Sequence, residues 1–366
     1  MWYEVNNAQA IISPALLVYP DRIKENIQKM ISISGGTKYL RPHIKTHKIS
    51  EIIQLQVDYG INKFKCATIA EAELLAKCEA KDILLAMQPV GIHINRFIEL
   101  IEEYPDSQFS TIVDNFKTID EISRIALSKK ITVSVWLDID CGMHRTGIPP
   151  GNKAVELYNI IDAKPELNAK GLHVYDGHIH EPGFNLRKNV CDEAFEPVLK
   201  LKKDIENSGI KVETMVAGGT PTFPFHSNRK NVETSPGTPL LWDAGYGESF
   251  KDLDFLPAAV LLTRIVSKPL GNLFCFDLGH KSVASEMSLP RVRLLGVTNF
   301  KQVSQSEEHL VVQSEEFDKY DIGAIFYAIP MHICPTVAKY KSVFTVVKGK
   351  ITGSWMVAAR DHKIFI

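Results

Sequence analysis

The sequence lacks the features of exported, membrane-spanning and nucleic-acid-binding proteins. No window approaches the roughly 20 consecutive apolar residues that span a bilayer, and no basic segment followed by an apolar stretch opens the chain. The 42 basic and 43 acidic residues leave a formal net charge of −1. Such a balance creates no long-range field that attracts nucleic acid or an anionic membrane. We therefore expect no nucleic-acid or membrane partner. We expect a cytoplasmic location and a small-molecule substrate.

The sequence also lacks paired cysteines and the common nucleotide-binding motifs. Its six cysteines are scattered without the paired spacing of a disulfide framework, which is typical of reduced thiols. Neither a GxGxxG turn after the first expected strand nor a Walker A sequence is present. These absences count against an open, doubly wound nucleotide-binding sheet, which is the main competitor of the fold predicted below.

The residues that are present predict two kinds of structure along the chain. Up to about residue 217, short β-rich runs alternate with longer amphipathic runs, which predicts parallel strands joined by helices. The eight expected strands are 15–19, 39–44, 63–67, 83–86, 109–113, 132–138, 171–175 and 212–216. Eight such units predict an α/β fold, namely an N-terminal (β/α)8 barrel of the TIM type over residues 13–247.

After residue 247 the pattern changes to alternating β-branched runs without helical crossovers. The expected strands there are 258–267, 273–277, 292–297, 309–312 and 342–347. We therefore predict a C-terminal β-rich domain over residues 248–366, completed by residues 1–12.

A basic segment, residues 41–48, ends the second expected strand. Period-two alternation places His43, Lys45 and His47 on one side of that strand. A partly desolvated lysine has a lowered pKa, and its free amine can form a Schiff base with an aldehyde cofactor. Lys48, the competing lysine, falls one residue out of phase with this alternation. A solvated basic rim remains the alternative interpretation of this segment.

Two further segments follow expected barrel strands. Gly218, Gly219 and Thr220 follow the last strand, where backbone N–H groups and a hydroxyl could bind a phosphate, although a simple turn would look the same. Arg145 follows the sixth strand. A guanidinium does not readily lose its proton, so beside a pyridine nitrogen it would keep that nitrogen unprotonated.

Histidines and a cysteine supply candidates for proton transfer and metal binding. Tyr175, His178 and His180 close the seventh expected strand, and histidine suits proton transfer near neutral pH, or serves only a structural role. His332 and Cys334 have a spacing of two, which on an extended segment turns a soft ligand pair toward one side and suits zinc. A buried cysteine beside a hydrogen-bonded histidine is the alternative.

Taken together, these segments resemble the D-threonine aldolase and D-serine dehydratase family of fold-type III pyridoxal-phosphate enzymes. The resemblance runs in order along most of the chain. It rests on Ser-Pro-Ala-Leu-Leu from residue 13, Arg-Pro-His-Ile-Lys-Thr-His-Lys from 41, Asp-Ile-Asp-Cys-Gly-Met-His-Arg-Thr-Gly from 138, Tyr-Asp-Gly-His from 175, Gly-Gly-Thr-Pro-Thr from 218, Ser-Glu-Glu-His from 306, His-Ile-Cys-Pro-Thr from 332, and the terminal Gly-Ser-Trp and Ala-Ala-Arg.

The resemblance implies a role for each candidate residue. Lys45 would carry pyridoxal 5'-phosphate, Arg145 would face its pyridine nitrogen, and Tyr175 would lie against it. His332 and Cys334 would bind a divalent metal, for which the His-x-Cys pair favours zinc, with manganese or magnesium as alternatives. The family fold is a barrel with a β-domain, usually in a homodimer. The implied phosphate ligands are Gly218, Gly219 and Thr220, with Gly237 and Thr238.

The resemblance implies a lyase that acts on D-β-hydroxy amino acids, with D-threonine aldolase as the first interpretation. D-serine dehydratase is the alternative, because the His-x-Cys pair is closer to the zinc-dependent dehydratases. The segment 175–180 is closer to the aldolases, in which His180 or His178 would be the base. An amino-acid racemase and a pyridoxal-phosphate-binding protein without turnover are the weaker alternatives.

Overall fold

The computed structural model describes all residues, 1–366, and divides into two compact units. The barrel unit consists of residues 30–45, 53–237 and 361–366. The β unit consists of residues 1–29, 46–52 and 238–360. No helix is long and apolar enough to cross a membrane. We predicted a boundary between the two domains at residue 247. In the structure the chain passes from the barrel unit to the β unit after Gly237.

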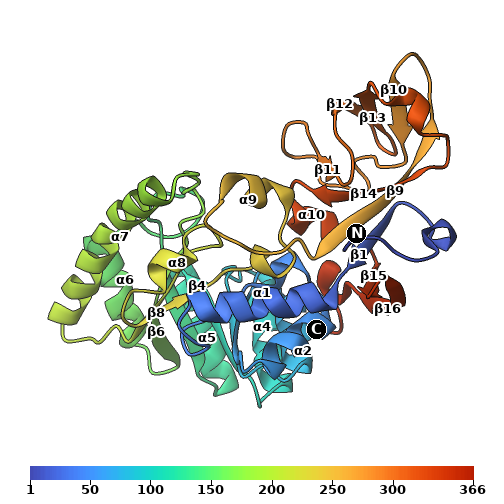
Figure 1. Cartoon of the computed structure of the whole chain (residues 1–366). Helices are drawn as coiled ribbons and strands as arrows, with labels where there is room; N and C mark the ends of the chain where they lie inside the picture. The colour runs from blue at the N-terminus through green and yellow to red at the C-terminus, as the bar shows by residue number, and fades with distance from the viewer. The chain divides into compact units, whose positions relative to one another are not determined.

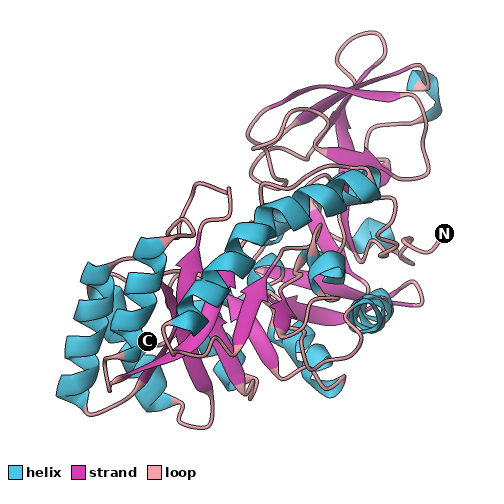
Figure 2. Ribbon diagram, turned by 90° about the vertical axis from the view of Figure 1, so that its left-hand side faces the viewer, coloured by secondary structure: helices cyan, strands magenta, loops and turns pink.

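The barrel unit is built on a parallel sheet flanked by helices (Figure 2). The strands of this sheet follow one another in chain order. Isolated parallel bridges join Leu40 to Thr234 and His43 to Lys65, so that residues 40–43 connect the last strand to the first. The predicted (β/α)8 architecture is confirmed, with residues 40–43 in the position of an eighth strand. The seven strands are β2 (Lys63–Cys66), β3 (Asp82–Leu85), β4 (Gln108–Val113), β5 (Val133–Ile139), β6 (Leu167–Val174), β7 (Thr214–Ala217) and β8 (Val232–Thr234).

The strands of the barrel differ from the prediction at two places. The run at 15–19 was expected to open the barrel, but β1 (Ala15–Val18) pairs with strands of the β unit instead. All four of its residues are buried, and a short buried apolar run carries no signal of which sheet it joins. Strand β8 was not predicted, because three residues, Val-Glu-Thr, are too few to show a periodic pattern.

Helices follow most of the barrel strands and flank the sheet (Figure 1). Polar caps mark where some of them begin: the Thr68 side chain accepts the backbone N–H of Glu71, and that of Asn115 accepts the N–H of Thr118. The helices of the N-terminal two thirds are α1 (Pro20–Ile33), α2 (Ser50–Asp58), α3 (Ile69–Lys77), α4 (Ile92–Glu103), α5 (Phe116–Lys129), α6 (Asn152–Asp162), α7 (Phe184–Asn207) and α8 (Phe223–His226).

Side chains from β3, β4, β5 and β7 pack together in the core of the barrel unit. Leu84, Ile112, Trp136 and Val216 form one buried cluster, and the Trp136 indole N–H donates to Ser110 Oγ over 3.0 Å. This packed layer makes the barrel a core rather than a pore, which leaves the C-terminal ends of the strands as the place for a site.

The β unit is a nine-stranded mixed sheet with short helices, which confirms the predicted β-rich C-terminal domain. β1 lies at its centre between β9 and β15. Its core includes Tyr3, Val5, Leu17, Val260, Leu262 and Val346. Besides β1, the strands are β9 (Ala259–Ser267), β10 (Leu273–Phe276), β11 (Val292–Leu294), β12 (Phe300–Gln305), β13 (Leu310–Ser314), β14 (Ile325–Pro330), β15 (Ser342–Val347) and β16 (Lys350–Met356), and the helices are α9 (Ala244–Ser249) and α10 (Ile333–Val337).

Candidate functional site

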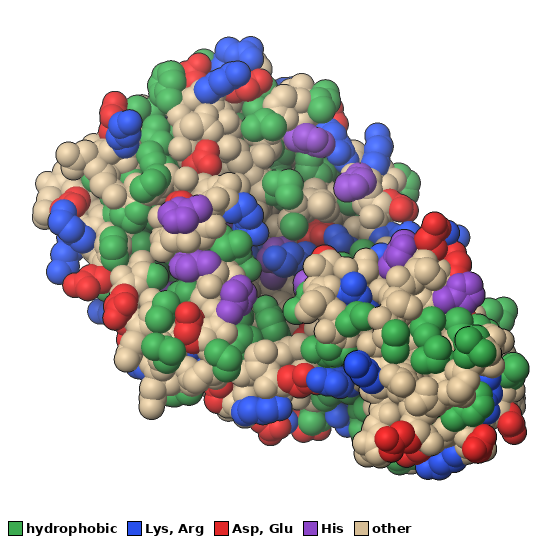
Figure 3. Space-filling view, turned by 90° about the horizontal axis from the view of Figure 1, so that it is seen from above, with side chains coloured by type: hydrophobic (Ala, Val, Ile, Leu, Met, Phe, Trp, Pro, Cys, Tyr) green, Lys and Arg blue, Asp and Glu red, His purple; other side chains and the backbone are tan.

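A cavity of about 410 Å³, hereafter the barrel cavity, lies in the barrel unit and is lined by residues of β2, β4 and β6 and of the loops after several strands. This is where barrel enzymes place their sites. Figure 3 shows several histidine side chains exposed at separate places on the surface. The lining residues are His43, Lys45, Lys65, Ala67, Ala86, Met87, Gln88, Ile112, Arg145, Thr146, His173 and Tyr175.

Three cationic side chains surround the ring of Tyr175 in this cavity. The Nζ atoms of Lys45 and Lys65 lie 5.6 Å and 5.5 Å from the ring centroid. The Arg145 guanidinium carbon lies 5.0 Å from the same centroid. The structure thus brings together Lys45, Arg145 and Tyr175, which lie far apart in the sequence. Positive charge and an aromatic face together suit an anionic ligand with a flat ring.

Lys45 is presented by a helical turn rather than by a strand. Residues 44–46 form a 3-10 turn, and the Lys45 backbone N–H donates to His43 Nδ1 over 3.2 Å. The predicted alternation therefore holds for His43 and Lys45, which both line the cavity, but not for His47, which is buried in the β unit. Lys48, the competing lysine, donates to the backbone oxygen of Ala359.

The glycines after β7 have the close approaches that require glycine. Gly218 has a φ of +79°, and a Cβ there would lie 2.8 Å from His226 Cδ2. A Cβ on Gly219 would lie 3.2 Å from the Tyr175 ring. The Gly237 N–H donates to Thr220 Oγ1 over 3.3 Å, which joins two predicted phosphate-binding segments. Thr238 follows Gly237 directly and begins a 3-10 turn, Thr238–Leu240, that belongs to the β unit.

A buried polar network lies behind this glycine turn and was not predicted. Asp176 accepts hydrogen bonds from Thr222 Oγ1 (2.8 Å) and His226 Nε2 (2.8 Å), and Cys191 Sγ lies 3.3 Å from the same Nε2. Burial alone would raise the pKa of Asp176, but His226 and Thr222 outweigh it and lower that pKa. Asp176, Cys191 and His226 also bring ligand atoms within 4.8 Å of one another, a spacing that could hold a metal ion.

The two histidines predicted as bases lie outside the lining of the barrel cavity. His178 is partly buried, its Nδ1 has no hydrogen-bond partner, and its ring packs against Gly142. His180 is exposed. Of the three histidines in and after β6, His173 is the one that lines the cavity.

Lys65, His173 and Asp138 form a buried chain that sequence analysis did not single out. Lys65 Nζ lies 3.3 Å from His173 Nε2, and His173 Nδ1 lies 2.6 Å from Asp138 Oδ1. Burial, together with the charge of Lys45, lowers the pKa of Lys65 to about 7. Burial and Lys65 also lower the pKa of His173. The available signal was a lysine inside a short strand, between Phe64 and Cys66, where a buried charge is costly.

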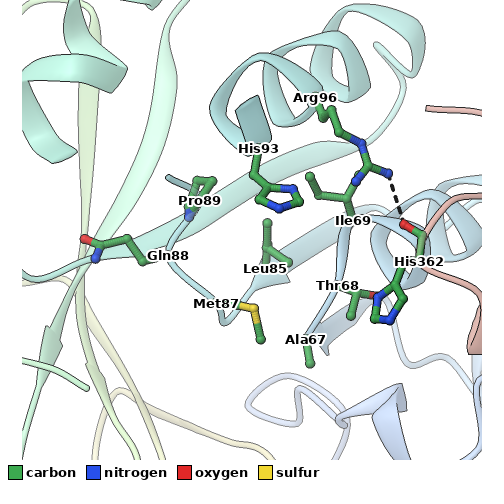
Figure 4. Close-up of a pocket in the computed structure, with 10 residues that line it drawn as sticks. All are labelled: Ala67, Thr68, Ile69, Leu85, Met87, Gln88, Pro89, His93, Arg96 and His362. Atoms are coloured by element: carbon green, nitrogen blue, oxygen red, sulfur yellow. Dashed lines mark hydrogen bonds between the residues drawn. The ribbon is translucent and has the colours of Figure 1, made fainter. Parts of the chain in front are cut away.

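A second cavity, of about 350 Å³, adjoins the barrel cavity and shares Ala67, Met87 and Gln88 with it (Figure 4). Its other walls combine apolar side chains with His93 and Arg96. The Arg96 guanidinium donates to the backbone oxygens of His362 (3.1 Å) and Ile366 (2.5 Å), so the chain terminus closes one side. The two cavities together give room for more than one small group.

His332 and Cys334 lie together in the β unit at the start of α10. His332 precedes the helix and contacts Glu286 through Nδ1, while Cys334 Sγ lies 3.2 Å from Thr46 Oγ1. Burial would lower the pKa of His332, but Cys334 and Glu286 outweigh it and raise that pKa to about 9. Asp243 accepts the N–H of the intervening Ile333. Glu286 and Asp243 are therefore two nearby carboxylates that the sequence spacing did not reveal.

Two family models match the chain. Residues 18–241 match "Alanine racemase, N-terminal domain", and residues 258–346 match "Putative serine dehydratase domain". The first match covers more than half of the chain, and the two together span both units.

Curated relatives match over most of their length. The chain is 28% identical to a 3-hydroxy-D-aspartate aldolase of Paracoccus denitrificans (strain Pd 1222), over 96% of this chain and 92% of the relative. It is 26% identical to a D-threonine aldolase of Arthrobacter sp., over 88% of this chain and 85% of the relative. It is also 26% identical to a D-serine dehydratase of Dictyostelium discoideum, over 94% of each chain.

Solved structures share the fold. The D-threonine aldolase from Filomicrobium marinum superposes with a TM-score of 0.88 at 24% identity, over 98% of both chains. The D-threo-3-hydroxyaspartate dehydratase from Delftia sp. HT23 superposes with a TM-score of 0.83 at 18% identity, over 98% of this chain and 99% of that one. These likenesses confirm the architecture of a barrel with a β-rich domain.

Proposed function

Because the chain belongs to the D-threonine aldolase and D-serine dehydratase family, whose members are pyridoxal-phosphate-dependent lyases, we propose that it cleaves D-β-hydroxy amino acids with the help of a divalent metal. The proposed reaction is that of a D-threonine aldolase, which yields glycine and acetaldehyde. The observation that carries the proposal is the meeting of Lys45, Arg145 and Tyr175 in one cavity.

The residues of the barrel unit fit pyridoxal 5'-phosphate. Lys45 offers the amine that bonds the aldehyde, and Tyr175 offers a ring face. The glycine turn leaves space that a Cβ at Gly219 would fill, and Thr220 adds a hydroxyl for a phosphate. Arg145 stays protonated and would favour an unprotonated pyridine nitrogen.

The bound cofactor would supply an electron sink for the pair released when a bond to the substrate Cα breaks. The chain's own groups would place charge and move protons. Lys45 would hold the cofactor through its amine, and a histidine would accept the hydroxyl proton of the substrate. His178 and His180 are the proposed acceptors of this proton.

The proposed metal ligands are His332 and Cys334. Imidazole and thiolate are soft ligands, and they favour zinc over manganese or magnesium. An ion held there would supply Lewis-acid help to a substrate hydroxyl group, so that the histidine need only be a modest base.

A D-serine dehydratase is the second candidate, and the His-x-Cys pair is the observation that favours it. In that reaction the metal would make the hydroxyl a leaving group, and Lys45 would remove the α-proton. The same residues serve both outcomes, so the products must decide between them.

Product analysis of the purified protein with cofactor and zinc tests the proposal. D-threonine, D-serine and 3-hydroxy-D-aspartate are offered separately. Glycine plus an aldehyde is the expected result. An α-keto acid plus ammonia would replace the aldolase by the dehydratase, and interconversion of D- and L-amino acids without cleavage would indicate a racemase. Turnover that is unaffected by chelators would contradict the catalytic metal.

Replacement of His332 by alanine is expected to remove tightly bound zinc while the cofactor stays attached. Removal of a residue that hydrogen-bonds to a metal ligand already lowers metal affinity by roughly 10- to 100-fold. Removal of a ligand itself should therefore lower the affinity by about 100-fold or more. Zinc per chain after dialysis, together with visible absorbance, measures both effects. His309→Ala is the matched control, because His309 is an exposed histidine of the same unit. Unchanged zinc in His332→Ala would place the metal elsewhere, for instance at Asp176, Cys191 and His226.

A further inference from the structure

The loop after β5, which carries Arg145, is bound to the loop after β4. Arg145 and Thr146 both line the barrel cavity. Gly147, two residues after Arg145, donates its backbone N–H to Oδ2 of Asp114 over 3.0 Å. We propose that Asp114 is a positioning residue: it fixes this loop and thereby holds the Arg145 guanidinium over the Tyr175 ring, where pyridoxal 5'-phosphate is proposed to bind. This inference rests on the proposed role of Arg145 toward the cofactor.

The loop is fixed on both sides of Arg145. Before Arg145, the carboxylate of Asp140 accepts the backbone N–H groups of Gly142 over 2.9 Å and His144 over 3.0 Å. After Arg145, the N–H of Gly147 is held by the neighbouring loop. Fixing the backbone on both sides leaves few conformations to the residues between. The Arg145 side chain is exposed, so the backbone that carries it decides where its guanidinium can reach.

Gly147 lies where the loop returns to the end of β5 without room for a side chain. It has a φ of +94°, and a Cβ there would lie 2.7 Å from the backbone nitrogen of Asp140. The next residue, Ile148, donates its N–H to the backbone oxygen of Asp138 over 2.9 Å. Because Gly147 is packed this tightly, a displacement of that residue is passed along the chain to Arg145.

The Asp114 carboxylate is itself held in place by two amide side chains. Its Oδ1 accepts hydrogen bonds from Gln88 Nε2 (3.0 Å) and Asn115 Nδ2 (2.8 Å), while its backbone N–H donates to Gln88 Oε1 over 3.0 Å. Asn115 also caps α5 by accepting the N–H of Thr118. Both carboxylate oxygens are therefore engaged, and Oδ2 is directed at Gly147 by a rigid support.

The test compares how tightly the full chain binds pyridoxal 5'-phosphate in Asp114→Ala, Arg145→Ala and the double variant. Each single substitution is expected to weaken binding about tenfold, because each takes the positive charge from its place beside the cofactor. The double variant should bind at most about twofold more weakly than Arg145→Ala, because Asp114 acts through Arg145. Titration followed by visible absorbance measures the affinities. The wavelength of the visible band should shift in the same direction in both single variants, because nearby charge tunes the cofactor.

Asp114→Asn is the second variant, because it keeps the size of the side chain and so protects the fold. An amide has one acceptor oxygen, whereas Gly147 and Gln88 each donate to a different oxygen of Asp114. We therefore expect Asp114→Asn to weaken cofactor binding in the same direction. Asp106→Ala is the matched control, since Asp106 is an exposed aspartate that precedes β4, and it should change neither the affinity nor the band.

Unchanged affinity in Asp114→Asn, or in an Asp114→Ala variant that folds, would overturn the inference. Losses that add up to about 100-fold in the double variant would also overturn it, because Asp114 and Arg145 would then act independently. Weaker binding in Arg145→Ala with unchanged Asp114 variants would remove only the role of Asp114. Unchanged binding in Arg145→Ala would remove the proposed role of Arg145 itself, and this inference with it.

Discussion

Replacement of Lys45 by alanine is expected to abolish the visible absorbance of the lysine-linked cofactor and to lower turnover by on the order of 10³-fold or more. Lys45 lines the barrel cavity, with its amine 5.6 Å from the Tyr175 ring centroid. Without this amine the aldehyde has no matched lysine to bond. Lys65 is more deeply buried and is engaged with His173. Absorbance of the purified variant with added cofactor, followed by borohydride reduction, measures the loss.

The matched control is Lys48→Ala, which removes a lysine of the same segment. The Lys48 amine donates to the backbone oxygen of Ala359 and does not line the barrel cavity. Lys48→Ala should therefore retain the absorbance and the turnover. A Lys45→Ala variant that keeps both would contradict the assignment, and one that keeps the absorbance alone would transfer the attachment to another lysine.

The periodic pattern was sufficient to predict the barrel but not the sheet to which each strand belongs. Buried strands of an α/β protein are short apolar runs, and β1 is such a run that pairs with β9 and β15. Pairing over more than 200 residues leaves no trace in local sequence. The opposite case is β8, which was not predicted because its three residues, Val-Glu-Thr, are too few to show a periodic pattern.

The site was predictable where residues follow strands in recognisable motifs. Lys45, Arg145 and Tyr175 were predicted in this way, and the structure brings them together in one cavity, while their roles stay predictions. The residues that were missed act through contacts between distant segments. Asp176 and His226 are 50 positions apart, and Lys65 and His173 are 108 positions apart, so that neither pair forms a motif.

Arg41 is a buried charge in the segment that closes the barrel. It follows Leu40, which bridges to β8, and its side chain is 1% exposed. Its Nε donates to Glu233 over 2.6 Å, and its two terminal nitrogens donate to Asp82 over 2.8 Å and 2.9 Å. Burial would lower the pKa of Arg41, but Glu233 and Asp82 outweigh it and raise that pKa further. The guanidinium thus joins the segment that closes the barrel to β8 and β3.

Replacement of Arg41 by methionine is expected to destabilise the barrel unit by about 3–5 kcal/mol, because the Glu233 carboxylate stays buried after losing its main partner. Urea unfolding followed by tryptophan fluorescence measures the change, since Trp136 is buried within the barrel. Arg124→Met, at an exposed position on α5, should change stability by less than about 0.5 kcal/mol. Adding Glu233→Gln to Arg41→Met should recover part of the loss, because it removes the stranded charge. A loss below about 1 kcal/mol in Arg41→Met would mean that Lys63, which also contacts Glu233, compensates that carboxylate alone.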